Sequence, residues 1–191
     1  MNRGSVSVSD LTTNDLVKSF DSSSNEWKFS RFVFFLHKDE KTLTEYISIK
    51  TSSNKNLKIS SMHLIPKRVN ENDMEFVLAK NLKLNDILIS EDNQNEIIID
   101  LTKVVEQGAY APLLETGTIS VNNILASCYA NTKWQGLVHF AFQPVIQLSN
   151  YFNMESTQTN NEILPNGINW YAGLLSSFLP FIPMSSSFVY L

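Results

Sequence analysis

The chain has 191 residues, enough for one domain with a substantial core or for one domain with an appendage. Its formal net charge of -4, from 15 Lys and Arg against 19 Asp and Glu, leaves no excess positive charge for a phosphate backbone and argues against nucleic acid as a partner. Three His and one Cys, without Cys-x-x-Cys or His-x-x-x-His spacing, argue against a metal site, and we expect no cofactor.

The first two thirds of the chain carry the signals of a β protein. The opening residues, MNRGSVSVSDL, contain no apolar run and are not a signal peptide, so an exported domain would need a signal on a longer precursor. From Ser5 to about Val121, short runs rich in Val, Ile, Phe and Thr alternate with polar turns, which predicts an all-β body. The segment EYISIKTSSNKNLKIS predicts a hairpin. The expected strands cover residues 32–36, 46–50, 57–59, 74–79, 87–89, 97–99 and 118–121.

Two segments of this β region resemble each other. LTTNDLV, which begins at Leu11, and LKLNDIL, which begins at Leu82, share Leu-x-x-Asn-Asp followed by two aliphatic residues. Ser19 and Ser90 follow at the same distance. We interpret this as a duplicated β unit arranged about a pseudo-two-fold axis. The alternative is that Asn-Asp is simply a common turn between strands.

The pattern changes after Cys128. Apolar residues at spacings of three and four predict one face of a helix, although Pro144 should kink or interrupt it. The face consists of Trp134, Val138, Ala141, Val145, Leu148 and Phe152. A polar linker follows, and the apolar end of the chain, with Pro180 and Pro183, is too short to span a membrane. It is interpreted either as a helix docked on the core or as an amphipathic segment that contacts lipid or a sterol.

Three further blocks identify a family. ISSMHLI, GAYAPLLETGTISVNNILASCYA and NGINWYAGLL with the later FLPFIP, together with the repeated Asn-Asp turns, resemble the Hint superfamily. The resemblance is specifically to the C-terminal autoprocessing (Hog) domain of Hedgehog and Hedgehog-related proteins. In that family the Asn-Asp positions are Gly-Asp turns, and ISSMHLI stands where a Thr-x-x-His motif is found.

The resemblance implies acyl transfer. In the family a leading Cys, preceded by Gly, attacks the preceding carbonyl to form a thioester, and a second nucleophile, cholesterol in Hedgehog itself, releases the upstream segment. His63 would then protonate or orient the scissile amide, and Ser60, at the Thr position, would offer a hydroxyl with looser positioning. Without the motif, His63 would be taken as an ordinary surface or core histidine.

Two departures from the family concern the nucleophiles. His37 stands where the family has an Asp that serves as base for the sterol hydroxyl. His37 could accept that proton or be a solvated residue at a strand end. This departure puts in doubt that cholesterol is the acceptor. The leading Cys should lie several residues before Met1. Cys128 is expected to be a packed or redox-exchanging thiol, with the attacking role as the alternative.

The absence of the leading Cys leaves two accounts: a fragment of a precursor that has Gly-Cys upstream, or a degenerate descendant that keeps the fold without the chemistry. The chain as given should be unable to cleave. The rival function is a non-catalytic Hint-shaped module that binds lipid or a protein partner. An intein would end in His-Asn, whereas this chain ends in FVYL.

The expected architecture is an all-β, pseudo-two-fold Hint fold over residues 1–130, with a short helical and apolar region over residues 131–191. The resemblance implies an upstream signalling segment as partner, a sterol or other lipid as acceptor, possible association with a membrane, and a secretory or extracellular location within a longer precursor. The residues expected to address the lipid are Trp170, Tyr171, Phe178 and Phe181.

Overall fold

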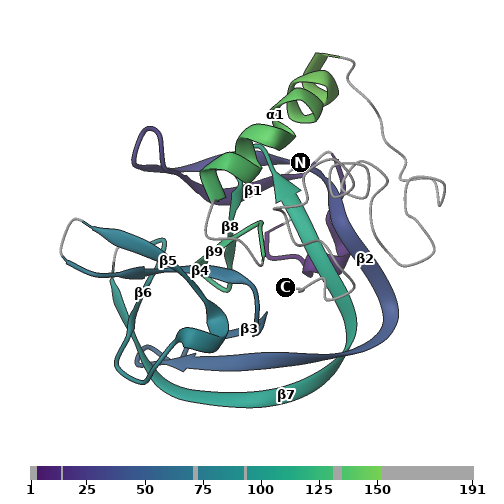
Figure 1. Ribbon diagram of the computed structural model, residues 1–191. Helices are drawn as coiled ribbons and strands as arrows, with labels where there is room; N and C mark the ends of the chain where they lie inside the picture. The colour runs from purple at the N-terminus through teal and green to yellow at the C-terminus, as the bar shows by residue number, and fades with distance from the viewer. Residues whose placement is uncertain (1–3, 14, 71–72, 93, 131–134, 152–191) are drawn as a thin grey trace.

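The computed structural model describes residues 4–13, 15–70, 73–92, 94–130 and 135–151. Strands dominate, and one α-helix follows them, as the sequence predicts (Figure 1). In chain order the elements are η1 (Val8–Asp10), β1 (Leu16–Asp21), β2 (Glu26–Thr51), β3 (Asn56–Ser60), β4 (Leu64–Arg68), β5 (Met74–Leu78), η2 (Ala79–Asn81), β6 (Ile87–Ile89), β7 (Asn95–Leu114), β8 (Thr118–Val121), β9 (Ile124–Ser127) and α1 (Gln135–Tyr151).

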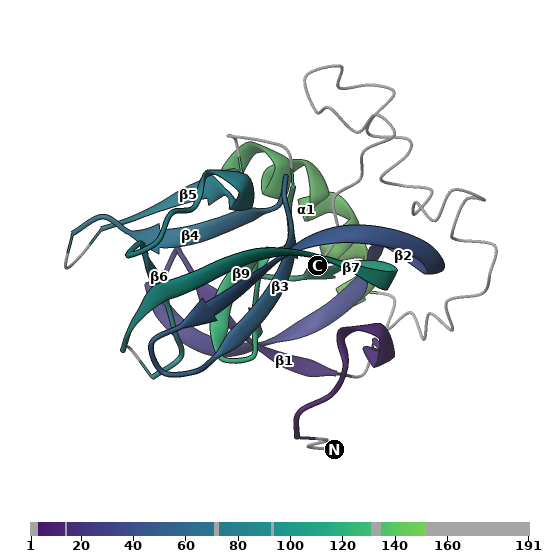
Figure 2. The same ribbon diagram turned by 90° about the horizontal axis from the view of Figure 1, so that it is seen from below.

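Two long strands form the frame of the molecule. β2 and β7 run antiparallel along most of their lengths and bend together, as Figures 1 and 2 show. The sheet order is β1-β2-β7-β6-β4-β5, and β3 pairs with β2. The predicted hairpin is confirmed, because Tyr46 lies opposite Ser60 and Lys50 opposite Asn56. The separate strands expected at 32–36 and 46–50 are instead parts of β2, which continues through a register irregularity between Asp39 and Leu43.

The predicted internal repeat is confirmed by matching hydrogen bonds. The Asp15 carboxylate accepts the backbone N–H of Thr12 at 2.7 Å, and the Asp86 carboxylate accepts that of Lys83 at 2.9 Å. The carbonyl of Asp15 accepts the N–H of Phe32 at 3.0 Å, and that of Asp86 accepts the N–H of Ile98 at 2.9 Å. Each Asp therefore closes a turn and joins it to the next long strand.

The elements around these two turns also correspond. A 3-10 turn comes just before each of them, η1 in the first half and η2 in the second. The strand after each turn, β1 or β6, pairs with the following long strand, β2 or β7. Because the same three-residue turn bond recurs between the same neighbouring elements in both halves, the Asn-Asp segments are copies of one unit and not merely common turns.

The core lies between the frame, the small β8–β9 sheet and α1. Phe32 and Phe35 of β2 pack edge-to-face with ring centroids 4.9 Å apart. Phe142 and Ile146 of α1 join the same cluster. Burying side chains of this size contributes about 1.5–3 kcal/mol each.

Among the described side chains of α1, residues 139–147, Phe142 and Ile146 are buried, whereas Ala141 and Val145 of the predicted face are only partly buried. The other residues of the predicted face lie outside the described side chains: Trp134, Val138, Leu148 and Phe152. The helix includes Pro144 and is not interrupted there. Among the described residues, no helix is both long and apolar enough to cross a membrane.

Candidate functional site

The turn between β3 and β4 positions the two residues of the ISSMHLI motif. Ser60 ends β3, and its carbonyl accepts the backbone N–H of His63 at 3.1 Å. The carbonyl of His63 accepts the N–H of Ala79 at 2.8 Å, so the turn is tied to the start of η2. β4 begins at the next residue, Leu64. His63 therefore sits at the entry of a strand, held on both sides by backbone bonds.

The imidazole of His63 is completely buried, with 0% of the residue exposed. Its Nε2 lies 2.7 Å from the carbonyl oxygen of Ser127, at the end of β9. Because a carbonyl oxygen only accepts, Nε2 carries the proton in this contact. In the neutral ring the lone pair then belongs to Nδ1, which makes Nδ1 the atom that can accept a proton.

Ser60 supplies a second polar group at this turn. The residue is 3% exposed, and its hydroxyl has no hydrogen-bond partner within the described part of the chain. A buried hydroxyl without a partner costs free energy and is available to a group that enters the site. The structure thus brings Ser60 and His63 together around one turn.

Cys128 directly follows Ser127, which holds the His63 ring. Its backbone N–H donates to the carbonyl of Gly117 at 2.9 Å, and its thiol is buried. Burial raises the pKa of the Cys128 thiol to about 12. Since the thiolate is the reactive form, this thiol is protonated and unreactive at neutral pH.

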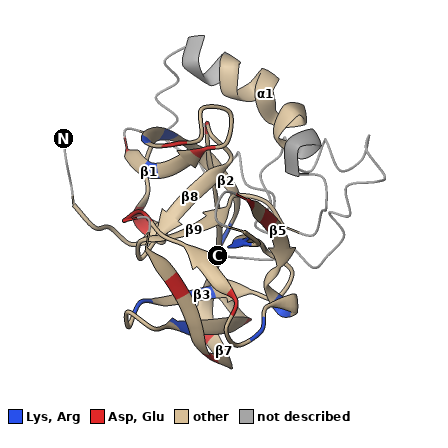
Figure 3. Cartoon of the chain, turned by 90° about the vertical axis from the view of Figure 1, so that its left-hand side faces the viewer, with Lys and Arg blue, Asp and Glu red and all other residues tan. Residues whose placement is uncertain are grey.

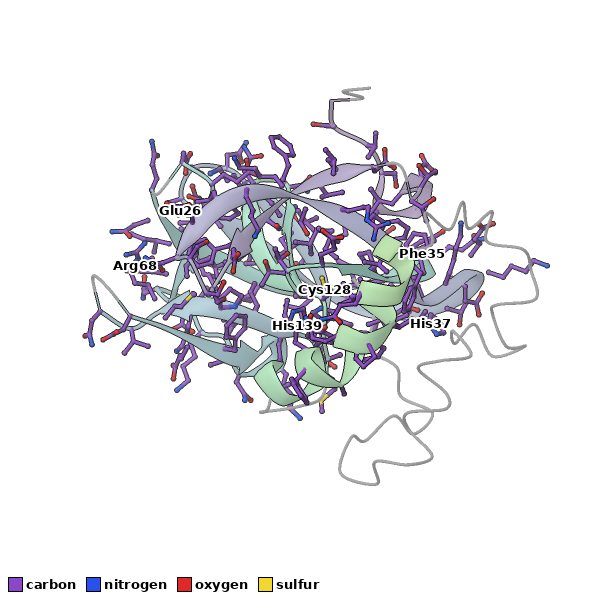
Figure 4. The ribbon with its side chains drawn as sticks, turned by 90° about the horizontal axis from the view of Figure 1, so that it is seen from above. Glu26, Phe35, His37, Arg68, Cys128 and His139 are labelled. Atoms are coloured by element: carbon purple, nitrogen blue, oxygen red, sulfur yellow. The ribbon has the colours of Figure 1, made fainter. Side chains whose placement is uncertain are left out.

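His37 lies on β2, opposite Ala111 of β7, and is 2% exposed. It is therefore a core residue and not the solvated strand end considered as an alternative from the sequence. Burial lowers its pKa to about 4, despite the opposing effect of Asp39. The imidazole is neutral at pH 7 and can accept a proton, although only as a weak base. In Figure 4, His37 lies to one side of Cys128.

A cavity of about 900 Å³ lies between the N-terminal segment, β1 and β8. It is lined by residues 4–8, Leu11, residues 15–18, Phe29, Glu91 and residues 119–123. Two of its apolar side chains are largely exposed, Leu16 at 65% and Phe29 at 63%. In the second half the corresponding space, between β5 and β6, is filled by β4.

Sequence reasoning missed a pair of residues next to this site. His139 of α1 places Nδ1 2.8 Å from the hydroxyl of Tyr129, which directly follows Cys128 in the chain. The apolar periodicity of the helix pointed to its neighbours Val138 and Ala141. A signal was present in the polar residues: His139 and Gln143 are four positions apart and so share a helix face.

Some predictions fall elsewhere. Trp170, Tyr171, Phe178 and Phe181 lie outside the described residues. Across the ranges that the structure describes, no group of three or more His, Cys, Asp or Glu side chains is placed to hold a metal ion.

Comparison with known proteins gives matches that cover most of the chain. The model of the Hint module family matches residues 1–182. Warthog protein 6 of Caenorhabditis elegans is 29% identical over 182 residues, covering 91% of this chain and 30% of the relative. Sonic hedgehog protein of Danio rerio is 30% identical over 187 residues, covering 90% of this chain and 44% of the relative. The chain thus spans less than half of these relatives.

Solved structures share the fold at low sequence identity. The intein-like domain from Clostridium thermocellum aligns with a TM-score of 0.54 and 16% identity, covering 64% of this chain and 87% of that domain. The gp41-1 intein aligns with a TM-score of 0.53 and 16% identity, covering 65% of this chain and 88% of the intein. These likenesses bear on the fold alone.

Proposed function

Since the chain belongs to the Hint module family and is homologous to the Hint domains of Hedgehog and Warthog proteins, we propose that it is the autoprocessing domain of a Hedgehog-related precursor. It releases an upstream signalling segment by way of an internal thioester. The nucleophile is a Cys that precedes Met1 in the precursor. The rival, a non-catalytic module that binds lipid or a partner, predicts no cleavage.

The observation that carries this proposal is the combination of the internal repeat with the cavity. In the second half, β4 lies between β5 and β6 and begins directly after His63. In the first half, the counterparts of β5 and β6 are residues 4–7 and β1, and the cavity lies between them. The counterpart of β4 would precede Met1. An upstream strand in this groove would cover Leu16 and Phe29.

The same correspondence supports the position of the nucleophile. The residue at the entry of the upstream strand is the counterpart of His63, which stands at the entry of β4. An upstream strand in the groove would lie beside β8, which pairs with β9, and the Ser127 carbonyl at the end of β9 holds the His63 ring. The carboxyl end of the released segment would then reach the turn formed by Ser60 and His63.

In the first step the Cys thiol attacks the carbonyl carbon of the residue before it. The C–S bond forms, the C–N bond breaks, and the thiol proton is transferred to the departing amide nitrogen. His63 Nδ1 receives and delivers this proton, because the bond from Nε2 to Ser127 fixes the ring. The Ser60 hydroxyl donates to the carbonyl oxygen as negative charge develops on it.

In the second step an acceptor hydroxyl attacks the thioester. The C–O bond forms, the C–S bond breaks, and the Cys leaves as thiolate. His37 takes the hydroxyl proton, and its lowered pKa makes it a weaker base than an unperturbed imidazole. The acceptor is a sterol or other lipid, addressed by residues 131–191 and in particular by Trp170, Tyr171, Phe178 and Phe181. Water is the competing acceptor.

Cys128 has a structural role in this scheme. Its buried, protonated thiol packs beside Ser127 and does not start the reaction. We also propose that the precursor passes through the secretory pathway, and that the C-terminal region contacts the membrane surface where the acceptor resides. The division into residues 1–130 and 131–191 belongs to the same proposal.

The test is a chain extended upstream by a reporter, Gly-Cys, a short apolar strand and a turn, with the Cys spaced from η1 as His63 is spaced from η2. Hydroxylamine or dithiothreitol should release the reporter. His63→Ala and replacement of the added Cys by Ala should each reduce release by about 10²-fold or more. A chain that folds but releases no reporter would favour the non-catalytic module.

A further inference from the structure

We propose that His139 is a positioning residue that fastens α1 to Tyr129, close to the end of β9. The inference rests on the proposed function, since it concerns the second step of that reaction. His139 takes no chemical step itself. Its hydrogen bond to Tyr129 joins α1 to the segment whose Ser127 carbonyl holds His63.

The hydrogen bonds of His139 define its protonation state. Gln143 places its amide nitrogen 2.8 Å from His139 Nε2. Because an amide nitrogen donates, Nε2 accepts, and the proton of the neutral ring lies on Nδ1. Nδ1 then donates to the Tyr129 hydroxyl at 2.8 Å. Burial lowers the pKa of His139, which favours this neutral form.

The main chain leaves room for this pair at Gly117. The φ of Gly117 is 73°, in the left-handed region. A Cβ at Gly117 would lie 2.7 Å from His139 Nδ1 and 3.1 Å from Tyr129 Cε2. A side chain here would push the imidazole away from the tyrosine hydroxyl. The glycine is therefore needed for the backbone conformation and for the contact.

Apolar packing surrounds the hydrogen bond but does not fix how far α1 is shifted along its axis relative to Tyr129. The Tyr129 and Phe142 rings are stacked with centroids 5.9 Å apart. The sequence of α1 contains no Lys, Arg, Asp or Glu, and the described middle of the helix is tan in Figure 3, so ion pairs from these side chains do not orient it. Stacked rings tolerate sliding, whereas a hydrogen bond requires a defined distance and angle.

Tyr129 links this contact to the site. Its backbone N–H donates to the Ser127 hydroxyl at 3.0 Å, and its carbonyl accepts the N–H of Leu64 at 3.2 Å. His63 is bound to Ser60 and Ser127 by bonds that do not involve α1. Loosening α1 should therefore slow the second step, which the proposed function assigns to residues 131–191, and leave the first step intact.

The experiment uses the reporter-Gly-Cys chain and compares three variants. His139→Asn keeps a donor close to the position of Nδ1, whereas His139→Gln places its amide near Nε2 and His139→Leu has neither. Cholesterol in detergent micelles probes the second step, and dithiothreitol probes the first. We expect H139L and H139Q to lose about tenfold in cholesterol-dependent release, with H139N near wild type and dithiothreitol release within about twofold in all. Equal loss in both assays, or no loss in H139L, overturns the proposal.

Amide hydrogen exchange in α1 gives a readout that does not depend on release. In the full chain, H139L should exchange about tenfold faster than wild type across residues 139–147, and H139N should restore protection. Unchanged protection in H139L overturns the fastening role even if the reaction cannot be observed. If the reporter-Gly-Cys chain with His139 intact releases no reporter with either cholesterol or dithiothreitol, the proposed function fails. The exchange data still decide the role of His139.

Discussion

His63 and Ser127 are joined by a 2.7 Å hydrogen bond from the imidazole Nε2 to the carbonyl oxygen, across 64 positions of sequence. The bond fixes the ring and also satisfies a carbonyl in the core. His63→Ala should therefore lower the free energy of unfolding by about 1–3 kcal/mol, because it leaves the carbonyl without its donor. His63→Gln, whose amide can reach the same oxygen, should lose less. Urea unfolding of the two variants measures the difference, and equal losses would contradict the assignment.

The buried histidine of β2 should make stability depend on pH. Its pKa is about 4 in the folded chain against 6.5 for the ordinary side chain. Between these values the unfolded chain binds a proton that the folded chain does not, so stability is full above pH 6.5 and falls toward pH 4, by up to about 3 kcal/mol. His37→Leu should remove this part of the pH dependence. Identical slopes in the variant and the parent would show that His37 does not titrate in this way.

The thiol of Cys128 should resist labelling. Its pKa of about 12 leaves almost no thiolate at pH 8, and the side chain is buried, so iodoacetamide should react only after unfolding. Guanidinium-unfolded chain provides the control for complete reaction. In the reporter chain, Cys128→Ala should retain release by dithiothreitol. Loss of that release in a variant that remains folded would give Cys128 a chemical role.

Gly117 and Gly4 offer a matched pair of substitutions. Both have positive φ, 73° and 65°, but a Cβ at Gly4 meets nothing within 4 Å, whereas at Gly117 it meets His139 and Tyr129. Gly4→Ala should lower the free energy of unfolding by about 1 kcal/mol through backbone strain alone, and Gly117→Ala should lower it by about 1–3 kcal/mol more. Thermal and urea unfolding measure the difference. Equal costs would mean that the space beside Gly117 is not needed.

Lys55 and Glu96 form a partly shielded ion pair, with Nζ and Oε1 2.8 Å apart and the carboxylate almost fully buried. Lys55→Met should destabilise the fold by about 3 kcal/mol at pH 7, because Glu96 loses its cation. Burial alone would raise the pKa of Glu96, but the hydrogen bonds to Lys55 and Ser53 outweigh it and the pKa is lowered. The stabilisation is therefore present above pH 4.5 and declines as the pH falls below it. A Lys55→Met variant as stable as the parent at pH 7 would contradict this.

The sequence predicted the repeated framework because its signal is local. Asp15 and Asp86 accept hydrogen bonds from residues three positions earlier. All residues that form the turn therefore lie in one short segment, and its repetition can be recognised in the sequence. The continuous β2 was missed because the polar residues near Asp39 resemble a loop, although they lie in a strand where β2 pairs irregularly with β7.

The site was predicted less completely than the fold. His63 and Ser60 belong to one short motif and could be identified together. Ser127 is distant in sequence, and its backbone carbonyl, which holds His63, has no sequence signature. His139 was overlooked because apolar periodicity ignores polar residues on a docked helix face. The burial of His37 likewise depends on strand pairing across the sheet.

The most direct measurement of the central claim is the mass of the reporter released by hydroxylamine from the strand-extended chain with Gly-Cys. A thioester beside His63 predicts a reporter that ends in a hydroxamate, formed in the parent and nearly absent in His63→Gln, which keeps the bond to Ser127 but has no imidazole. A reporter that ends in a free acid without reagent dependence, or equal hydroxamate in parent and His63→Gln, would contradict the claim that His63 activates an upstream thiol.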